Sequence, residues 1–298
     1  MNELSLAVDI GGTKLAVGLV DRTGELIHSR HRPTPHTGAP ELVWSDLAEL
    51  VEDERRQAQE VGLVTVCGVG CGGPMSLEQG LVSPLNIPAW QTFPLRQRLS
   101  DLTGTATFLD NDAKALAVGE GWKGAARGRR DYLAMVVSTG VGGGIVLDGR
   151  LLDGRLGNAG HIGHVVVEPE GRPCVCGGRG CLEAEASGTA IAAITGGEPA
   201  NAPSEIVARC GAMVGRAVAS VANLLDLSLA VVAGSVALGF GEPFFEAARH
   251  ELHARAGMAF SAGTEIVPAG LGARGPLVGA GAVGWLGTGM VIWEKRVR

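Results

Sequence analysis

The sequence predicts an α/β protein built from two related β-rich halves. Along its 298 residues, apolar strand patterns alternate with segments of helical spacing, and this alternation is typical of sheets covered by helices. The order strand, glycine turn, strand, polar turn occurs at the start of the chain and again near its middle. Such an internal repeat indicates two similar halves, which we expect to face a cleft.

The first half begins with an apolar strand over residues 4–8 that runs into a turn at Gly11 and Gly12. Apolar runs predict further strands, and apolar residues at three- and four-residue spacing predict a helix. In chain order these are a strand over 14–20, a polar turn over 21–24, a strand over 25–32, a loop over 33–40, a helix over 41–61 and a strand over 64–70. The expected order is therefore β-β-β-α-β.

The remainder of the chain continues the alternation. A strand ends at Asp110, and a helix over 113–122 follows it. The second copy of the opening pattern is a strand over 131–137, a glycine turn, a strand over 144–147 and a polar turn at 148–149. Beyond it we predict helices over 190–195, 204–225 and 244–256, strands over 229–232 and 264–268, and a final apolar helix over 277–293.

Composition and charge exclude several classes of protein. The formal net charge is −6, which does not fit the basic surface of a nucleic-acid-binding domain. No uncharged apolar run reaches the eighteen or so residues of a membrane span, and the start of the sequence lacks the features of a signal peptide. We therefore expect a cytoplasmic protein with no nucleic-acid or membrane partner and with reduced cysteines.

A first candidate for phosphate binding lies where the first strand ends, in the sequence Asp9-Ile10-Gly11-Gly12-Thr13-Lys14. The glycines expose backbone N–H groups and Lys14 adds a positive charge, and both favour phosphate oxygens. The Asp9 carboxylate favours a metal-bound water. The spacing is not that of a P-loop, and a plain β-hairpin turn could have the same residues.

A second glycine turn has the sequence Ser138-Thr139-Gly140-Val141-Gly142-Gly143-Gly144. Four glycines in five positions are costly in backbone entropy unless a ligand comes close to the chain. The two turns together predict a phosphate chain that is gripped from two sides. Gly234 and Ser235, after an apolar strand, could let an adenine ring lie against the backbone, although any strand-to-helix turn looks similar.

The sequence Asp110-Asn111-Asp112 lies at the end of a strand, directly before a predicted helix. A carboxylate there can accept a proton from an attacking hydroxyl group, and Asn111 can orient the same substrate. Asp and Asn are also common N-cap residues of helices. On spacing alone, the capping interpretation is the simpler one.

A metal site is predicted from the residues His164, Cys174, Cys176 and Cys181. Three thiolates and one imidazole complete a tetrahedral zinc site without an open position, which is typical of a structural rather than a catalytic zinc. Cys174 and Cys176 are closer together than the cysteines of a usual CxxC pair, which indicates a particular type of loop. The alternative is a set of reduced thiols in a glycine-rich loop.

Together these residues resemble the ROK family (repressors, open reading frames, kinases), within the superfamily of sugar kinases, heat-shock proteins and actin. The most specific similarity is Gly157-Asn158-Ala159-Gly160-His161-Ile162-Gly163-His164 followed by Cys174-Val175-Cys176-Gly177-Gly178-Arg179-Gly180-Cys181-Leu182-Glu183. The resemblance runs from Asp9 to about Gly284. It implies a two-domain actin-like (ribonuclease H-like) ATPase fold with an inter-domain cleft. We expect a small N-terminal domain over 1–112 plus 280–298, and a large domain over 113–279 that carries the zinc loop and the nucleotide site.

The resemblance also implies roles for the residues that match family motifs. Asp112 would be the catalytic base that takes the proton of the sugar 6-hydroxyl, and Glu183 would bind hydroxyls near C1 and C2. His164 would bind zinc with one nitrogen and face the sugar with the other. The substrate-binding residues would be Gly72, Asn86, Asn111, Asp112, His161, His164 and Glu183. The residues for ATP and its phosphates, with Mg²⁺, would be Asp9, Gly11, Gly12, Thr13, Lys14, Thr139, Gly140, Gly142, Gly234 and Ser235.

Two positions depart from the family pattern. Many glucokinases of the family have Glu where this chain has His161, whereas its bacterial N-acetylmannosamine kinases have His. Histidine donates or accepts one hydrogen bond per nitrogen and glutamate only accepts, so an amino or N-acyl hexosamine is favoured, with glucose or another hexose as alternatives. Cys71-Gly72-Gly73-Pro74 stands where relatives often have a Pro-Gly pair, and we expect it to keep the tight turn near the sugar.

The sequence thus predicts an ATP-dependent hexose or hexosamine 6-phosphotransferase with a structural zinc. The rival from another class is a sugar-responsive repressor, but the first phosphate turn begins at Asp9, and we expect no helix-turn-helix ahead of it. A catalytically inactive sugar sensor is disfavoured by Asp112, Lys14 and the two glycine turns. Polyphosphate stays open as an alternative donor to ATP. The family resemblance implies a homodimer or homotetramer.

Overall fold

The computed structural model describes residues 2–36 and 38–293, and the chain divides into two compact units. Unit 1 lies within residues 1–128, 153–158 and 271–298, and unit 2 comprises residues 129–152 and 159–270. The domain division at 112/113 and 279/280 stays a prediction; by their contacts, the helix after residue 112 and the chain from Leu271 group with unit 1. The last part of that predicted division, residues 294–298, lies outside the described residues.

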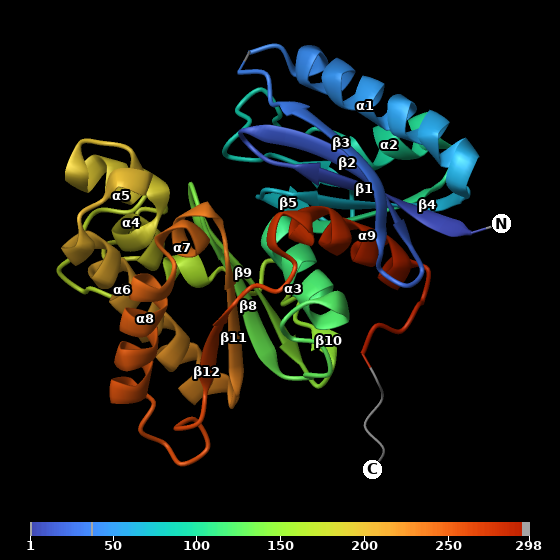
Figure 1. Ribbon diagram of the computed structural model, residues 1–298. Coiled ribbons are helices and arrows are strands. Elements are labelled where there is room, and N and C mark those ends of the chain that lie inside the picture. The colour runs from blue at the N-terminus through green and yellow to red at the C-terminus, as the bar shows by residue number, and fades with distance from the viewer. Residues whose placement is uncertain (1, 37, 294–298) are drawn as a thin grey trace. The chain divides into compact units, whose positions relative to one another are not determined.

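Unit 1 is built on a five-stranded sheet with the strand order β3-β2-β1-β4-β7 (Figure 1). The strands are β1 (Glu3–Ile10), β2 (Lys14–Asp21), β3 (Leu26–Pro33), β4 (Leu63–Cys71) and β7 (Ala106–Asn111), and a separate small pair is β5 (Met75–Ser76) and β6 (Leu81–Val82). The first three strands form an antiparallel meander, and β4 and β7 run parallel to β1. The side chains of β1 are largely buried on both faces, as expected for a sheet that helices cover on both sides.

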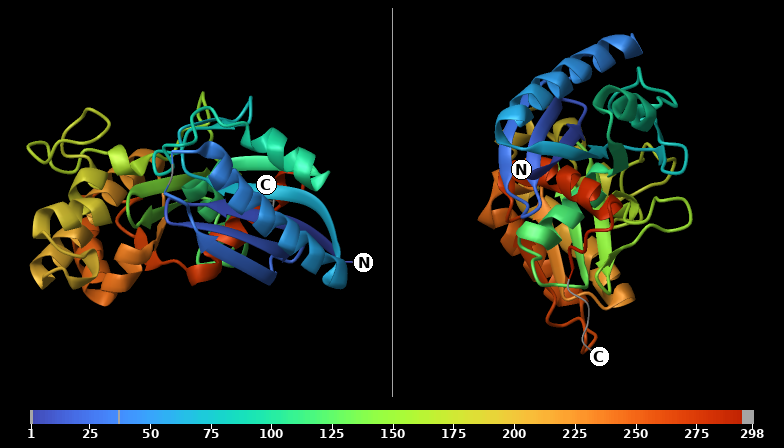
Figure 2. Two further views of the ribbon diagram at one scale, coloured as in Figure 1. Left: turned by 90° about the horizontal axis from the view of Figure 1, so that it is seen from above. Right: turned by 90° about the vertical axis from the view of Figure 1, so that its right-hand side faces the viewer.

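Helices cover both faces of this sheet (Figures 1 and 2). On one face lie α1 (Pro40–Val61) and α2 (Leu95–Thr103), and on the other lie α3 (Asp112–Lys123) and α9 (Gly275–Gly287). α1 buries Val43, Leu47 and Val51, which lie four residues apart and therefore on one face of the helix. The helix predicted over 41–61 is thus confirmed.

Glycines let α9 pack its backbone directly against its neighbours. A Cβ on Gly284 would lie 2.6 Å from Oγ of Ser5 on β1, and a Cβ on Gly279 would clash with the backbone of Ala115 on α3. The sequence predicted this helix over 277–293, which is wrong at its C-terminal end because the helix ends at Gly287. Gly289 has φ +87°, a left-handed conformation that terminates helices.

Unit 2 repeats the sheet topology of unit 1. Its strand order is β10-β9-β8-β11-β12, formed by β8 (Tyr132–Val137), β9 (Val141–Leu147), β10 (Arg150–Leu151), β11 (Leu229–Ala233) and β12 (Glu265–Pro268). β8 and β9 form an antiparallel hairpin as β1 and β2 do, and β11 and β12 continue the sheet in parallel. This topology confirms the internal repeat that the sequence predicted.

The helices of unit 2 are α4 (Leu182–Ala186), α5 (Gly188–Thr195), α6 (Ser204–Leu225), α7 (Ser235–Phe240) and α8 (Glu242–Arg255). Short 3₁₀ turns are η1 (Ile162–His164), η2 (Pro199–Asn201) and, in unit 1, η3 (Gly272–Arg274). The predictions of α5, α6 and α8 are confirmed. The short helices α2, α4 and α7 were missed. α4 and α7 have only five and six residues, which offer little apolar periodicity. Among the described helices, none is long and apolar enough to cross a lipid bilayer.

We expect Gly279→Ala to lower the free energy of unfolding by roughly 1–3 kcal/mol, because the added methyl group overpacks the contact between α9 and α3. Gly239→Ala on α7 is the matched control, since a Cβ there meets no atom within 4 Å. Urea denaturation followed by circular dichroism measures both variants. Wild-type stability of Gly279→Ala would contradict the close approach of the two helices.

Candidate functional site

The motif residues of unit 1 lie at the carboxyl ends of its parallel strands. Asp9 of β1 is paired with Gly70 of β4, and Gly70 is paired with Asp110 of β7. A Cβ on Gly70 would lie 3.8 Å from Oδ1 of Asp9 and 3.6 Å from Cα of Asp112. Gly70 therefore lies beside both Asp9 and Asp112, at the edge of an α/β sheet where ligands usually bind.

The first glycine turn connects β1 to β2 as a tight hairpin. The Gly11 N–H donates to the Lys14 carbonyl at 3.0 Å, and Thr13 and Lys14 are exposed. Thr34, buried just after β3, donates its hydroxyl to the Gly11 carbonyl at 2.7 Å and its N–H to the Thr13 carbonyl at 3.1 Å. The hairpin interpretation is thus correct for the backbone, and Thr34 fixes its shape.

Two predicted sugar-binding residues of unit 1 lie near this turn and the loop beside it. A Cβ on Gly12 would come within 2.5 Å of the Asn86 Cβ, so the absence of a side chain lets the turn approach Asn86 closely. Gly72 follows β4, and a Cβ there would lie 3.7 Å from Pro84 Cβ. Asn86 therefore belongs to the surroundings of the first glycine turn.

Asn111 and Asp112 form the N-terminus of α3. Oδ1 of Asn111 accepts a hydrogen bond from the Ala113 N–H at 3.1 Å, and Oδ1 of Asp112 accepts from the same N–H at 2.8 Å. The capping interpretation of this motif is therefore confirmed. Capping leaves the Asp112 side chain exposed at a helix N-terminus, where the helix dipole stabilises negative charge.

The electrostatics of this edge centre on Asp9. The pKa of Asp9 is raised to about 7, first by burial and then by the nearby Asp112 carboxylate, and Lys14 opposes the increase. Two neighbouring carboxylates disfavour each other's ionisation. A bound cation would reverse that effect, because it stabilises both negative charges.

Lys114 is a buried charge whose importance the sequence analysis missed. It is 1% exposed, and its Nζ lies 3.1 Å from Asp110 and 2.7 Å from Asp153. The same ammonium donates to the Gly157 carbonyl at 3.3 Å. Burial raises the pKa of Asp110, and Lys114 opposes that rise. The ion cluster ties the start of α3 to residues 153–158, the segment that leads into the most specific motif of the chain.

In unit 2, the second glycine turn connects β8 to β9 and lies against the start of α7. The Ser138 N–H donates to the Gly140 carbonyl at 2.9 Å, and the hydroxyl oxygens of Ser138 and Ser235 are 2.9 Å apart. Gly234 has φ +102°, and a Cβ there would clash with the Val137 backbone. The predicted phosphate turn and the predicted adenosine turn are therefore in contact.

The remaining two residues predicted for phosphate binding differ in their positions. Thr139 is exposed within the second turn. Gly142 is the second residue of β9, where it pairs with Val136 of β8. Gly142 therefore lies in the strand beside the turn rather than within the turn itself.

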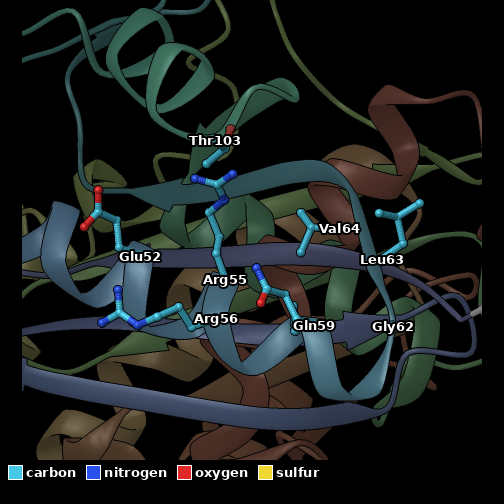
Figure 3. A pocket seen from close by; sticks show the side chains of 9 residues that line it. Glu52, Arg55, Arg56, Gln59, Gly62, Leu63, Val64 and Thr103 are labelled. Atoms are coloured by element: carbon cyan, nitrogen blue, oxygen red, sulfur yellow. The ribbon is translucent and has the colours of Figure 1, made fainter.

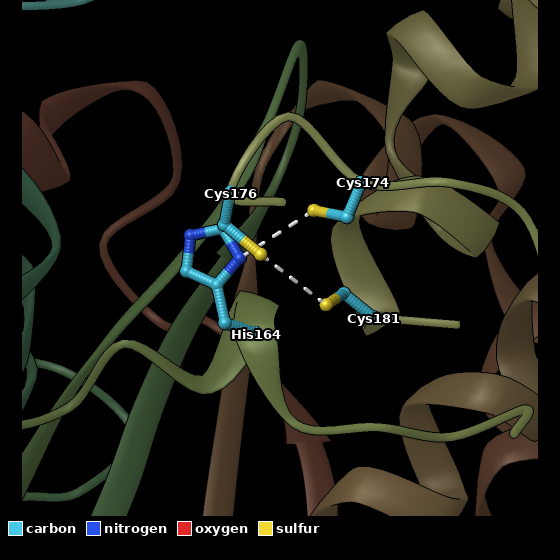
Figure 4. Close-up of side chains that lie close together, drawn as sticks. All are labelled: His164, Cys174, Cys176 and Cys181. Carbon is cyan, nitrogen blue, oxygen red and sulfur yellow. Dashed lines mark hydrogen bonds between the residues drawn. The ribbon is translucent and has the colours of Figure 1, made fainter. Parts of the chain in front are cut away.

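The four predicted metal ligands of unit 2 face one another (Figure 4). All donor atoms lie within 4.8 Å of one another in the set His164, Cys174, Cys176 and Cys181. The Sγ atoms of Cys176 and Cys181 are 3.7 Å apart, as are Sγ of Cys174 and Nδ1 of His164. Zinc–sulfur bonds of about 2.3 Å give a tetrahedron with edges of about 3.8 Å, so this donor set fits a four-coordinate zinc.

The thiols of this cluster differ in acidity. Hydrogen bonds, first from the Gly178 backbone and then from Cys174, lower the pKa of Cys176. Burial and the neighbouring thiols raise the pKa of Cys181 to about 12. Metal binding requires deprotonated sulfurs, and a cation among the three thiols would remove the repulsion that keeps Cys181 protonated.

The predicted sugar-binding residues of unit 2 adjoin the metal cluster. The rings of His161 and His164 are stacked, with centroids 6.2 Å apart. Because Nδ1 of His164 faces Cys174, its Nε2 is the nitrogen available to another partner. Glu183 follows Cys181 by two residues and accepts a hydrogen bond from the Val141 N–H at 2.9 Å, a contact that the sequence did not predict.

A hollow of about 500 Å³ lies elsewhere in unit 1, where the C-terminal part of α1 meets the first residues of β4 (Figure 3). Its lining includes Arg55, which donates to the Leu102 carbonyl at 2.8 Å. Arg56, also in the lining, pairs with Asp53. Leu63 at this hollow and Gly70 at the motif residues occupy opposite ends of β4, so the hollow is separate from the candidate site.

We expect Asp9→Asn to become more stable than the wild type as pH rises. Because the folded-state pKa of Asp9 is raised to about 7 from 3.8, the folded protein holds the extra proton between these values, and the wild type loses stability through that window. The relative gain should be roughly 1–3 kcal/mol between pH 4 and pH 7. Thermal unfolding without nucleotide or Mg²⁺, with the exposed Asp101→Asn as control, measures it. Parallel pH curves for Asp9→Asn and the wild type would contradict the raised pKa.

Comparison with known proteins places the chain in a family. Residues 5–284 match the sequence model of the ROK family. The N-acetylmannosamine kinase of Citrobacter koseri is 38% identical to this chain over 263 residues, which cover 83% of this chain and 88% of that protein.

Solved ROK structures have the same fold. The ROK hexokinase from Thermus thermophilus has a TM-score of 0.82 and 35% identity and covers 96% of this chain and 99% of its own. The ROK family glucokinase from Streptomyces griseus, in complex with glucose and AMPPNP, has a TM-score of 0.80 and 28% identity and covers 95% and 99%. The repeated sheets are thus those of the expected actin-like two-domain fold. The chain belongs to the ROK family.

Proposed function

We propose that this protein is an ATP-dependent sugar kinase that transfers the γ-phosphoryl group to the 6-hydroxyl of a hexose or hexosamine. The observation that carries the proposal is the exposed carboxylate of Asp112, at the same sheet edge as the first glycine turn. The kinase relatives of the chain support the same activity. Together these features supply a base, a phosphate-binding backbone and a family in which kinases are common.

In this mechanism, Asp112 accepts the proton of the attacking 6-hydroxyl as that oxygen bonds to the γ-phosphorus and the bond to the leaving ADP oxygen breaks. Phosphoryl transfer requires little covalent work from the protein, so positioning and charge neutralisation dominate. Lys14 and the N–H groups of the glycine turns bind phosphate oxygens, and Gly234 and Ser235 bind the adenosine. Asn86 and Asn111 orient the sugar.

Two metals belong to the proposal. Mg²⁺ bound with ATP would neutralise part of the phosphate charge. At the first turn, the Asp9 carboxylate would accept a hydrogen bond from a water bound to that Mg²⁺. Zinc would be held by His164, Cys174, Cys176 and Cys181, where it would fix the loop that presents His164 and Glu183. The donor distances in this loop fit zinc.

For the acceptor, we propose an amino or N-acyl hexosamine, with glucose as the second candidate. His161, which is exposed and stands where many glucokinases of the family have Glu, favours the first, and so does the similarity to an N-acetylmannosamine kinase. The similarity to a glucokinase that binds glucose favours the second. ATP is the proposed donor, with polyphosphate as the alternative. A cytoplasmic homodimer or homotetramer completes the proposal.

The function is tested by coupled ADP release from Mg-ATP with glucose, mannose, N-acetylglucosamine, N-acetylmannosamine and free amino-hexoses. We expect the highest kcat/KM with an amino or N-acyl sugar, and His161→Glu should shift the preference towards glucose by about tenfold or more, because a carboxylate only accepts hydrogen bonds. Turnover of glucose above all others would favour the glucokinase alternative. Absence of turnover with every sugar would overturn the proposed activity.

We expect Asp112→Asn to reduce kcat by roughly 10²–10⁴-fold, since the amide cannot accept the hydroxyl proton. Folding should persist, because the asparagine oxygen can still accept from the Ala113 N–H. Steady-state kinetics measure the loss, circular dichroism verifies the fold, and Asp101→Asn on α2 is the control. Turnover close to that of the wild type would remove Asp112 from the role of base.

We expect the purified protein to contain about one zinc per chain, because the donor set is closed and four-coordinate. Cys176→Ser should lose the metal and raise the sugar KM, whereas Val175→Ala, at the exposed residue between two ligands, should keep it. Elemental analysis and competition with a chelator measure binding. A zinc-free wild type purified without chelators would contradict the site.

A further inference from the structure

The second glycine turn is held by one continuous segment, residues 181–189, which contacts it at three points. The contact through Glu183 is a side-chain hydrogen bond, and those through Gly188 and Thr189 involve backbone carbonyls of the turn. The segment begins at a predicted zinc ligand, Cys181, and includes a predicted sugar ligand, Glu183. It therefore joins the metal cluster, the sugar residues and the phosphate turn within unit 2.

Glu183 makes the most specific of these contacts. Its Oε2 accepts a hydrogen bond from the Val141 N–H at 2.9 Å, and Val141 is buried. A Cβ on Gly140 would lie 2.8 Å from the same oxygen, closer than real Cβ atoms approach. A side chain at position 140 would therefore displace the Glu183 carboxylate from its present place. The bond to Val141 uses one oxygen of Glu183, so the other can receive a sugar hydroxyl.

The remaining contacts come from the start of α5. The Gly188 N–H donates to the Ser138 carbonyl at 2.7 Å. The Thr189 hydroxyl donates to the Thr139 carbonyl at 3.0 Å, and the Thr189 N–H donates to the same carbonyl at 3.2 Å. Ser187 caps α5 by accepting from the Ala190 N–H, which fixes the direction from which these donors reach the turn.

The start of the segment is equally anchored. The Leu182 N–H donates to the Val165 carbonyl at 2.9 Å, so α4 begins beside His164. Cys181 pairs with Val166 in an isolated β-bridge. A displacement of the metal loop would therefore be transmitted along a short, hydrogen-bonded segment to Glu183.

We propose that Glu183 is a positioning residue for the ATP phosphate turn, in addition to any contact with sugar. It holds the Val141 N–H and the Gly140 backbone in the shape that receives phosphate oxygens. A sugar hydroxyl on its second oxygen orders the same carboxylate, so sugar and nucleotide strengthen each other's binding. Such a coupling is reciprocal, typically fivefold or more. The inference rests on the proposed function, because it takes the turn as the ATP site.

The first experiment measures the Kd of Mg-AMPPNP by calorimetry in the absence of sugar. Glu183→Ala should weaken binding at least about fivefold, because it leaves the Val141 N–H without its acceptor. Glu183→Gln has a side chain of the same length and keeps an acceptor oxygen, so its nucleotide affinity should lie within about threefold of the wild-type value. Its sugar affinity should be lower than that of the wild type. A residue that only binds sugar would give wild-type nucleotide affinity in both variants.

A second pair of variants avoids the predicted sugar contact. Thr189→Val keeps the side-chain volume but removes the hydroxyl donor to the Thr139 carbonyl, whereas Thr189→Ser keeps that donor. We expect Thr189→Val to weaken Mg-AMPPNP binding severalfold. Glucose or N-acetylmannosamine should also increase the affinity for Mg-AMPPNP less than it does in the wild type, whereas the affinity for the sugar alone should be unchanged. Thr189→Ser should behave as the wild type. Circular dichroism and metal content establish that each variant is folded.

The outcomes separate this inference from the proposed function. Wild-type nucleotide affinity in both Glu183→Ala and Thr189→Val overturns the positioning role, even if the protein phosphorylates sugars. Loss of nucleotide affinity in these variants supports the role, even if no tested sugar is turned over. A wild-type chain that fails to bind Mg-AMPPNP overturns the ATP site and the inference with it.

Discussion

The register of the parallel strands determines where the charged groups of unit 1 lie. Asp9, Gly70 and Asp110 occupy one row across β1, β4 and β7, so the hydrogen bonds of the sheet fix the first glycine turn relative to the start of α3. A slip of one residue would turn these side chains to the opposite face. Phosphoryl transfer depends on positioning and charge neutralisation, and a sheet edge supplies a rigid base for both.

The same edge concentrates negative charge, and the fold balances it with specific cations. Lys14 opposes the raised pKa of Asp9, and the buried Lys114 pairs with Asp110 and Asp153. A buried ammonium is tolerated only when it is paired, and removal of one partner is strongly destabilising. Its pairing therefore fixes residues 153–158, the chain that leads to the histidine motif.

The two glycine turns are fixed by similar means on different scaffolds. In unit 1 the Thr34 hydroxyl donates to the Gly11 carbonyl, and in unit 2 the Thr189 hydroxyl donates to the Thr139 carbonyl. Each threonine lies just after a strand or near the start of a helix, and it holds a carbonyl of the turn in place. Unit 2 adds Glu183 and the metal loop, so its turn is linked to groups expected to contact sugar.

The amino-acid sequence predicted the fold class, the repeat, most strands and long helices, and the motif residues, because these depend on apolar periodicity, glycine turns and ligand spacing. It placed Cys174 and His164 in one cluster for the same reason. The contacts of Thr34, Lys114 and Glu183 and the end of α9 became evident from the folded structure alone. The three contacts depend on strand register and helix packing, which bring together residues 23 to 42 positions apart. Local patterns do not encode such partners, because a hydrogen bond or buried ion pair is specified by where the fold places both of its ends.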